Sequence, residues 1–126
     1  MIERRKNIRA KKNIPVKLTD ESFDIITETV DISSSGAYCR VTRNLLPMSK
    51  IEVVLLIPGK DSNNPTRKIK CKGVVVRAEP TIIKGADKAH YNIAIFFTDI
   101  SKKDQKIAED YIASGSPDPA EIQISQ

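Results

Sequence analysis

The sequence predicts a mainly β fold, a small closed or nearly closed barrel with one helix after its last strand. Six or seven short segments are rich in β-branched residues or alternate apolar with polar residues, and turn-forming residues separate them. Only residues 101–114 carry apolar residues at helical spacing. The 126 residues are enough for one domain with one hydrophobic core.

The first three predicted strands cover residues 13–20, 22–33 and 37–41. The first and third alternate apolar with polar residues, as a strand with one buried face does. The second is rich in Ile, Thr, Val and Phe, which favour strands. A hairpin turn is expected at Asp20 and Glu21, between the first two strands.

The next three predicted strands cover residues 50–59, 67–79 and 90–99. In the middle one the alternation changes after Gly73, which predicts a bulge or sharp bend at that glycine. Residues 80–89 are expected to form a long, irregular loop.

The predicted helix covers residues 101–114. Ser101 and Asp104 form a start that resembles a capping box. Apolar residues follow on one face, and we expect this face to pack across one opening or flank of the barrel: Ile107, Ala108, Tyr111 and Ile112.

The surplus positive charge is confined to the start of the chain. Residues 1–12 hold six of the 21 basic side chains and one of the 16 acidic ones, so they carry the whole net charge of +5. Charge concentrated in this way is typical of a mobile segment that binds an anion. The alternative is a solvated leader that only aids solubility. We therefore expect a flexible basic arm over residues 1–12, a barrel and helix over 13–113, and a loose tail over 114–126.

The composition favours a cytoplasmic protein. No window approaches eighteen continuous apolar residues, and the charged N-terminus has no apolar signal region, so neither a membrane span nor secretion is expected. Cys39 and Cys71 have no metal-ligand spacing and are expected to be small buried hydrophobic residues, with no metal bound.

Two motifs carry the chemistry. Arg5 and Arg9 form RxxxR; a guanidinium group grips phosphate with two hydrogen bonds and matches the O6 and N7 edge of guanine. Asp31, Ser33 and Gly36 form DxSxxG, in which a carboxylate can accept from guanine N1 and N2 and glycine permits a close backbone approach. Each motif alone is also ordinary basic-segment or turn chemistry. Together they predict a site for purine and phosphate at the rim of a barrel.

These residues resemble the PilZ domain family. The family's two motifs resemble the arm "ERRKNIRAKKNIPVKL" and the segment "VDISSSGAYC" of this sequence. Its later strands resemble "KGVVVRAE" and "YNIAIFFTDIS". The resemblance implies a six-stranded antiparallel β-barrel of the split-barrel type with a C-terminal helix. It also implies a receptor for the bacterial second messenger cyclic di-GMP, with no other cofactor. The RxxxR arginines would bind guanine and phosphate. The residues of DxSxxG would bind the other side of the base. The arm would rearrange around the ligand.

Two positions add detail to this resemblance. The family often carries glycine in the closing strand near Asn92 and Ala94, which puts the local strand geometry in question. Arg4 directly precedes RxxxR, and we hypothesise that it stacks on a second guanine, so that the site holds an intercalated dimer of cyclic di-GMP.

The sequence is compatible with more than one function. The preferred one is a receptor or adaptor that signals to an unidentified protein partner. The alternatives are a PilZ scaffold that binds only proteins and a small-barrel binder of single-stranded nucleic acid. The chain has only six aromatic residues for base stacking, which disfavours the nucleic-acid binder. An enzyme is not expected, because His90 is the only histidine and no residue pattern indicates a nucleophile or an acid–base pair.

Overall fold

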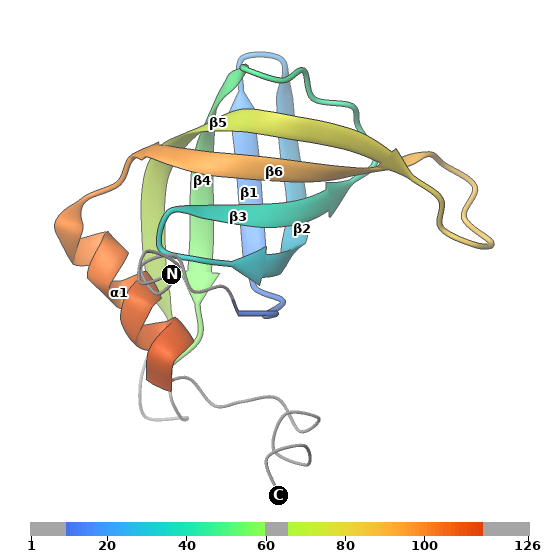
Figure 1. Cartoon of the computed structure of the whole chain (residues 1–126). Helices are drawn as coiled ribbons and strands as arrows, with labels where there is room; N and C mark the ends of the chain where they lie inside the picture. Colours follow the sequence, from blue (N-terminus) through green and yellow to red (C-terminus); the bar gives the residue numbers. More distant parts are fainter. Residues whose placement is uncertain (1–9, 60–65, 115–126) are drawn as a thin grey trace, which may run out of the picture.

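The computed structural model describes residues 10–59 and 66–114, and within them the chain forms six strands and one helix (Figure 1). This confirms the predicted element order, and the ends of the elements differ from the sequence prediction by at most two residues. The elements are β1 Pro15–Asp20, β2 Phe23–Ile32, β3 Gly36–Val41, β4 Lys50–Ile57, β5 Arg67–Thr81, β6 His90–Asp99 and α1 Lys102–Ser114.

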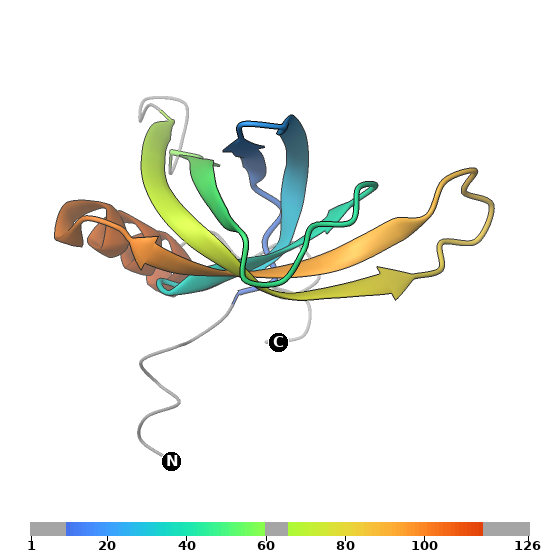
Figure 2. The same cartoon turned by 90° about the horizontal axis from the view of Figure 1, so that it is seen from above.

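The strands close into a barrel in the order β1-β2-β3-β6-β5-β4 (Figure 2). Every neighbouring pair is antiparallel, including the β1–β4 pair that completes the ring. The expected six-stranded antiparallel barrel is therefore confirmed. Closure gives each strand a neighbour on both sides, so fewer strand edges are exposed than in an open sheet.

The β1–β2 hairpin turns at the expected place. The carboxylate of Asp20 accepts hydrogen bonds from the backbone N–H of Ser22 at 2.6 Å and from its hydroxyl at 2.9 Å. The bond from the backbone N–H of Ser22 is the main reason why the pKa of Asp20 is lowered from its ordinary value.

The expected irregularity at Gly73 is also present. The β5–β6 register shifts between Lys72 and Gly73, and a second shift follows between Val75 and Arg77. A Cβ atom on Gly73 would lie 2.8 Å from the Cγ2 atom of Ile95 and 3.1 Å from the carbonyl oxygen of Phe96, so a side chain here would force β5 or β6 to shift. These shifts let β5 curve from one side of the barrel to the next.

The predicted end of β5 was wrong by two residues. The strand continues through Pro80, which pairs with Tyr91, and ends at Thr81, so the irregular loop is shorter than residues 80–89. Proline is tolerated because the hydrogen bonds of β5 on its β4 side end at Val75. Beyond that point β5 has only one partner, and the missing N–H of proline breaks no ladder bond.

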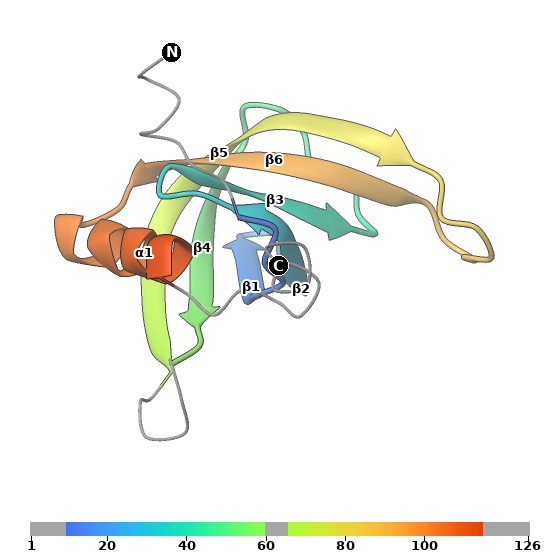
Figure 3. The ribbon, with the colours of Figure 1, turned by 60° about the horizontal axis from the view of Figure 1, so that its bottom comes forward.

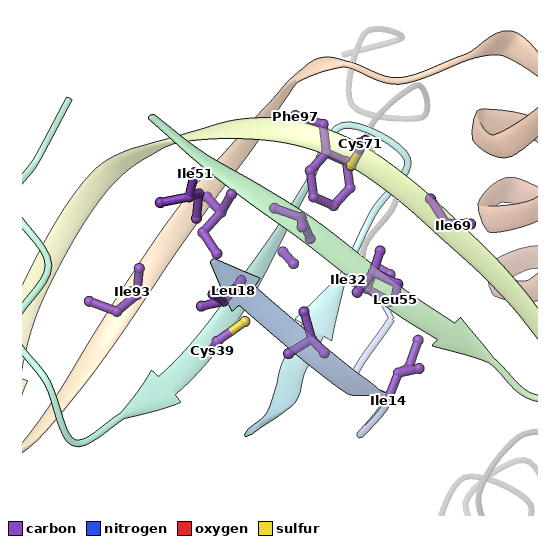
Figure 4. Packing of buried hydrophobic residues seen from close by; sticks show 14 of the residues in the cluster. Ile14, Leu18, Ile32, Cys39, Ile51, Leu55, Ile69, Cys71, Ile93 and Phe97 are labelled. Carbon is purple, nitrogen blue, oxygen red and sulfur yellow. The ribbon is translucent and has the colours of Figure 1, made fainter. Parts of the chain in front are cut away.

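The core fills the barrel with the inward-facing residues of all six strands (Figure 4). As expected, Cys39 and Cys71 are free and buried among aliphatic side chains. Burial raises the pKa of each thiol to about 12. The fully buried side chains include Ile14, Leu18, Ile32, Leu55, Ile69 and Ile93.

Helix α1 begins and packs as the sequence predicts (Figure 3). The hydroxyl of Ser101 accepts a hydrogen bond from the backbone N–H of Asp104 at 3.1 Å and so caps the first turn. Ala108 is fully buried, and Ile107, Tyr111 and Ile112 pack partly buried against the barrel core. In the described part of the chain, no helix has the length and hydropathy needed to cross a membrane.

Candidate functional site

The DxSxxG segment forms the end of β2, a tight turn and the start of β3. The backbone N–H of Ser33 donates to the carbonyl of Gly36 at 2.9 Å. The Ser33 hydroxyl accepts from the backbone N–H of Ser35 at 3.2 Å. Because Ser33 is fully buried, its hydroxyl holds the turn together in this conformation and does not face solvent.

Gly36 is a glycine because of a close approach between strands. Its backbone pairs with Phe96 on β6, and a Cβ atom would lie only 2.3 Å from the carbonyl oxygen of Ile95. The left-handed backbone that often requires glycine is not involved, because Gly36 lacks a positive φ. In this structure the backbone that approaches Gly36 closely is that of the protein's own strand β6.

The end of the basic arm is paired with the DxSxxG segment. The N–H of Ala10 donates to the carbonyl of Ile32 at 2.9 Å, and the N–H of Ile32 donates to the carbonyl of Ala10 at 3.0 Å. Ile32 lies between Asp31 and Ser33, and Ala10 directly follows Arg9. The structure thus brings the residue that directly follows RxxxR to the backbone of the DxSxxG segment. Arg9 itself lies outside the described residues, as do Arg4 and Arg5.

Thr29 anchors the base of this arm, a role that the sequence did not reveal. Its hydroxyl donates to the carbonyl of Lys12 and accepts from the backbone N–H of Ile14 at 3.0 Å. Its own N–H donates to the carbonyl of Ile14, and its carbonyl accepts from the side chain of Asn13 at 2.8 Å. Thr29 is fully buried, and the register shift that follows it leads to Asp31.

The outer face of the sheet beside Asp31 offers a second set of residues. Asp31 pairs with Tyr38 on β3, and Tyr38 pairs with Ala94 on β6, so the three lie in one row across the sheet. In the neighbouring row, Gly36 faces Phe96, whose side chain is half exposed. Two aromatic side chains therefore lie next to the motif, and only the strand pairing reveals this.

The closing strand keeps regular geometry along β3. Asn92 and Ala94 pair with Arg40 and Tyr38 without a register shift. The side chain of Arg40 donates to the amide oxygen of Asn92 at 3.2 Å. The β3–β6 ladder is therefore regular at both positions, whereas on the other edge of β6 the register shift between Val75 and Arg77 falls opposite Ile95 and Ala94.

The carboxylate of Asp31 influences the ionisation of the neighbouring Cys39 thiol. Burial is the main cause of the raised pKa of the Cys39 thiol, and the negative charge of Asp31 raises it further.

A side-chain contact links the arm to the helix, because the ammonium group of Lys12 lies 5.6 Å from the centre of the Tyr111 ring. At that distance a cation–π attraction joins the base of the arm to α1.

The remaining candidate chemistry lies away from this site. His90 begins β6, next to the Tyr91–Val41 pair at the far end of β3 from the DxSxxG turn, and its Nδ1 lies 3.0 Å from the carbonyl of Lys88. Over residues 10–59 and 66–114, no three His, Cys, Asp or Glu side chains are grouped so that they could hold a metal ion.

The sequence matches the family model described as "PilZ domain" over residues 3–114, nearly the whole chain. The chain belongs to the PilZ domain family. This confirms the resemblance that the two motifs indicated. A search of curated proteins gave no significant match to the sequence.

Solved structures share this PilZ fold. The Bacillus subtilis inhibitor of motility MotI (DgrA) superposes with a TM-score of 0.70 at 17% identity, over 96% of this chain and 52% of that one. MrkH of K. pneumoniae gives a TM-score of 0.69 at 14% identity, over 94% of this chain and 51% of MrkH. This chain thus spans about half the length of MotI and MrkH. The PilZ domain of Escherichia coli YcgR, a structure with c-di-GMP, gives 0.67 at 10% identity, covering 97% of this chain and 96% of that one.

Proposed function

We propose that this PilZ domain is a receptor for cyclic di-GMP in the bacterial cytoplasm. The observation that carries the proposal is the pairing of Ala10 with Ile32, because it joins the RxxxR arm to the DxSxxG turn. Family membership supports the same ligand, and so does the YcgR PilZ domain, whose structure contains c-di-GMP. The binding surface we propose is the outer face of β3 and β6 beside that turn.

Each motif residue has a role that follows from its chemistry. The guanidinium groups of Arg5 and Arg9 bind phosphate and the O6 and N7 edge of guanine. The carboxylate of Asp31 accepts hydrogen bonds from guanine N1 and N2. Ser33 and Gly36 hold the turn in the shape that presents Asp31 and lets β3 lie close to β6.

We further propose that the arm over residues 1–12 becomes ordered around the ligand. Arm ordering of this kind converts binding into a changed surface, which a protein partner then recognises. Thr29 keeps the base of the arm beside the site, since it fixes Lys12 and Ile14. Only the segment before Ala10 then has to rearrange, which limits the entropy lost on binding.

Calorimetric titration with cyclic di-GMP tests the receptor function. The wild-type protein should bind with a micromolar or tighter Kd, about −8 kcal/mol. An Arg5→Ala/Arg9→Ala variant should give no heat, and GTP should give none with either protein. A Lys84→Ala/Lys88→Ala variant is the matched control, because it removes two exposed charges from the β5–β6 loop. No heat from folded wild-type protein would overturn the receptor and favour a scaffold that binds only proteins.

The same titration tests whether Arg4 stacks on a second guanine. A site that holds an intercalated dimer should bind two molecules of cyclic di-GMP per protein chain. An Arg4→Ala variant should then bind one. One ligand per chain at saturation of the wild-type protein would contradict the dimer.

A further inference from the structure

A groove of about 700 Å³ runs between the start of β5 and helix α1. Five basic side chains line it: Arg67 and Lys68 from β5, and Lys102, Lys103 and Lys106 from α1. All five are exposed, and no residue of the DxSxxG segment belongs to the lining. We call these five residues and the space between them the basic groove.

Among the residues that the structure describes, basic side chains outnumber acidic ones in the lining of the basic groove. Two carboxylates, Asp104 and Asp110, also line it, which leaves an excess of three positive charges. Asp110 pairs with Lys106 at 3.3 Å, an exposed contact four residues apart on the helix. Clustered charge of one sign beside low-dielectric walls attracts ligands of the opposite sign.

The lining favours a peptide over a nucleic acid. The groove's described lining includes no aromatic side chain that could act as a platform for base stacking. A nucleic acid carries a charge on every phosphate, which Asp104 and Asp110 would repel. A peptide can space its carboxylates and donate backbone N–H groups to those aspartates. Ile107 adds an apolar contact for one aliphatic side chain.

We propose that the basic groove binds an acidic peptide segment of a partner protein. Lysine and arginine from two different elements would hold the carboxylates of that segment, and Ile107 would contact an apolar residue within it. Helix α1 also contacts the base of the arm through Tyr111 and Lys12, so one helix links this surface to the nucleotide site proposed above. The groove proposal does not depend on nucleotide binding and can fail or succeed separately from it.

A fluorescein-labelled peptide of glutamate, serine and one leucine is the probe, with fluorescence anisotropy as the readout. The test variant is Lys68→Glu/Lys103→Glu, which reverses one charge on each wall. The control is Lys84→Glu/Lys88→Glu, which makes the same charge change in the β5–β6 loop, at the end of the molecule away from α1. Thermal melting by circular dichroism checks that both variants fold.

The test variant should bind the peptide at least about tenfold more weakly than the wild-type protein, and the control should stay within about twofold. A peptide with glutamine in place of glutamate should not bind the wild-type protein. Three results would overturn the proposal: no binding of the acidic peptide, equal weakening in both variants, or tighter groove-dependent binding of single-stranded oligothymidine than of the peptide. Adding cyclic di-GMP to each titration shows whether the two sites are coupled.

Discussion

Ala10 and Ile32 exchange two backbone hydrogen bonds, at 2.9 Å and 3.0 Å, and so form a single antiparallel bridge outside the named strands. The bridge lies between the basic arm, which carries all the net charge, and the end of β2, which carries Asp31. Its base is supported by Thr29 from within the barrel. The stability of this junction and the binding of the nucleotide should therefore depend on the same few residues.

Thr29→Val should destabilise the protein and loosen the base of the arm. The substitution keeps the shape of the side chain but leaves the N–H of Ile14 and the carbonyl of Lys12 without their buried partner. We expect a loss of about 1–3 kcal/mol in the free energy of unfolding, measured with urea. Thr27→Val is the control, because the Thr27 hydroxyl donates to the carbonyl of Arg40 in an exposed position. Equal stability of the two variants would contradict the anchoring role.

Gly36→Ala should separate β3 from β6. The new methyl group would lie 2.3 Å from the backbone oxygen of Ile95, which cannot move as a side chain end can. We expect a loss of at least about 1–3 kcal/mol in the free energy of unfolding, together with weaker binding of cyclic di-GMP.

Gly85→Ala serves as the comparison. A Cβ atom at Gly85 would meet nothing within 4 Å, and only the φ of 82° at this position opposes the change. That variant should lose about 1–2 kcal/mol and bind the nucleotide normally. A fully stable Gly36→Ala protein would show that β6 does not constrain this position.

The two thiols should be unreactive in the folded protein and should make its stability fall in alkali. Burial raises the pKa of Cys39 and of Cys71 to about 12, from an ordinary value of 9.0. The unfolded chain therefore loses these protons first. The thiols' contribution to stability is complete below about pH 9 and is lost as the pH rises toward 12.

Urea unfolding at about pH 8 and pH 10 measures this loss, which is at most about 1.4 kcal/mol per pH unit for each thiol. A Cys39→Ala/Cys71→Ala variant should lose much of that pH dependence, although it starts less stable. Ellman's reagent should label the wild-type thiols only as fast as the protein unfolds. Rapid labelling of native protein at about pH 8 would contradict the burial of both cysteines.

Tyr111→Leu should weaken the contact between the arm and α1. The substitution keeps an apolar side chain against the core but removes the ring beneath the Lys12 ammonium group. We expect a loss of about 0.5–1 kcal/mol in unfolding free energy. Tyr111→Phe keeps the ring and should cost less. If Tyr111→Leu and Tyr111→Phe lost the same stability, the loss of the phenol hydroxyl would explain the effect, and the cation–π contact would not.

The sequence alone supported most of the fold because its local signals agree with one another. Apolar alternation or richness in β-branched residues located the six strands, Ser101 marked the start of the helix, and Gly73 marked a register shift. Each of these signals depends only on residues that are close together in the sequence. The extension of β5 through Pro80 was missed, because proline is tolerated there only where the pairing of β5 with β4 has stopped, beyond the first residue of β4.

The site was less predictable because its key contacts join distant positions. The hydroxyl of Thr29 meets Lys12 and Ile14, and Gly36 meets Ile95, nearly sixty residues later. Neither pairing leaves a pattern in the local sequence. The motifs predicted which segments form the candidate site, but only the strand pairing shows that Tyr38 lies beside Asp31.

The central claim is that the arm and the DxSxxG turn form one nucleotide site on the outer face of β3 and β6. Amide ¹H–¹⁵N NMR spectra, recorded as cyclic di-GMP is added, test it most directly. Large shifts should be confined to the arm, to the Asp31–Tyr38 segment and to Asn92–Phe96 on β6, and Lys84 and Lys88 should not move. The absence of shifts, or shifts centred on the β5–β6 loop or on the basic groove, would contradict the proposed site.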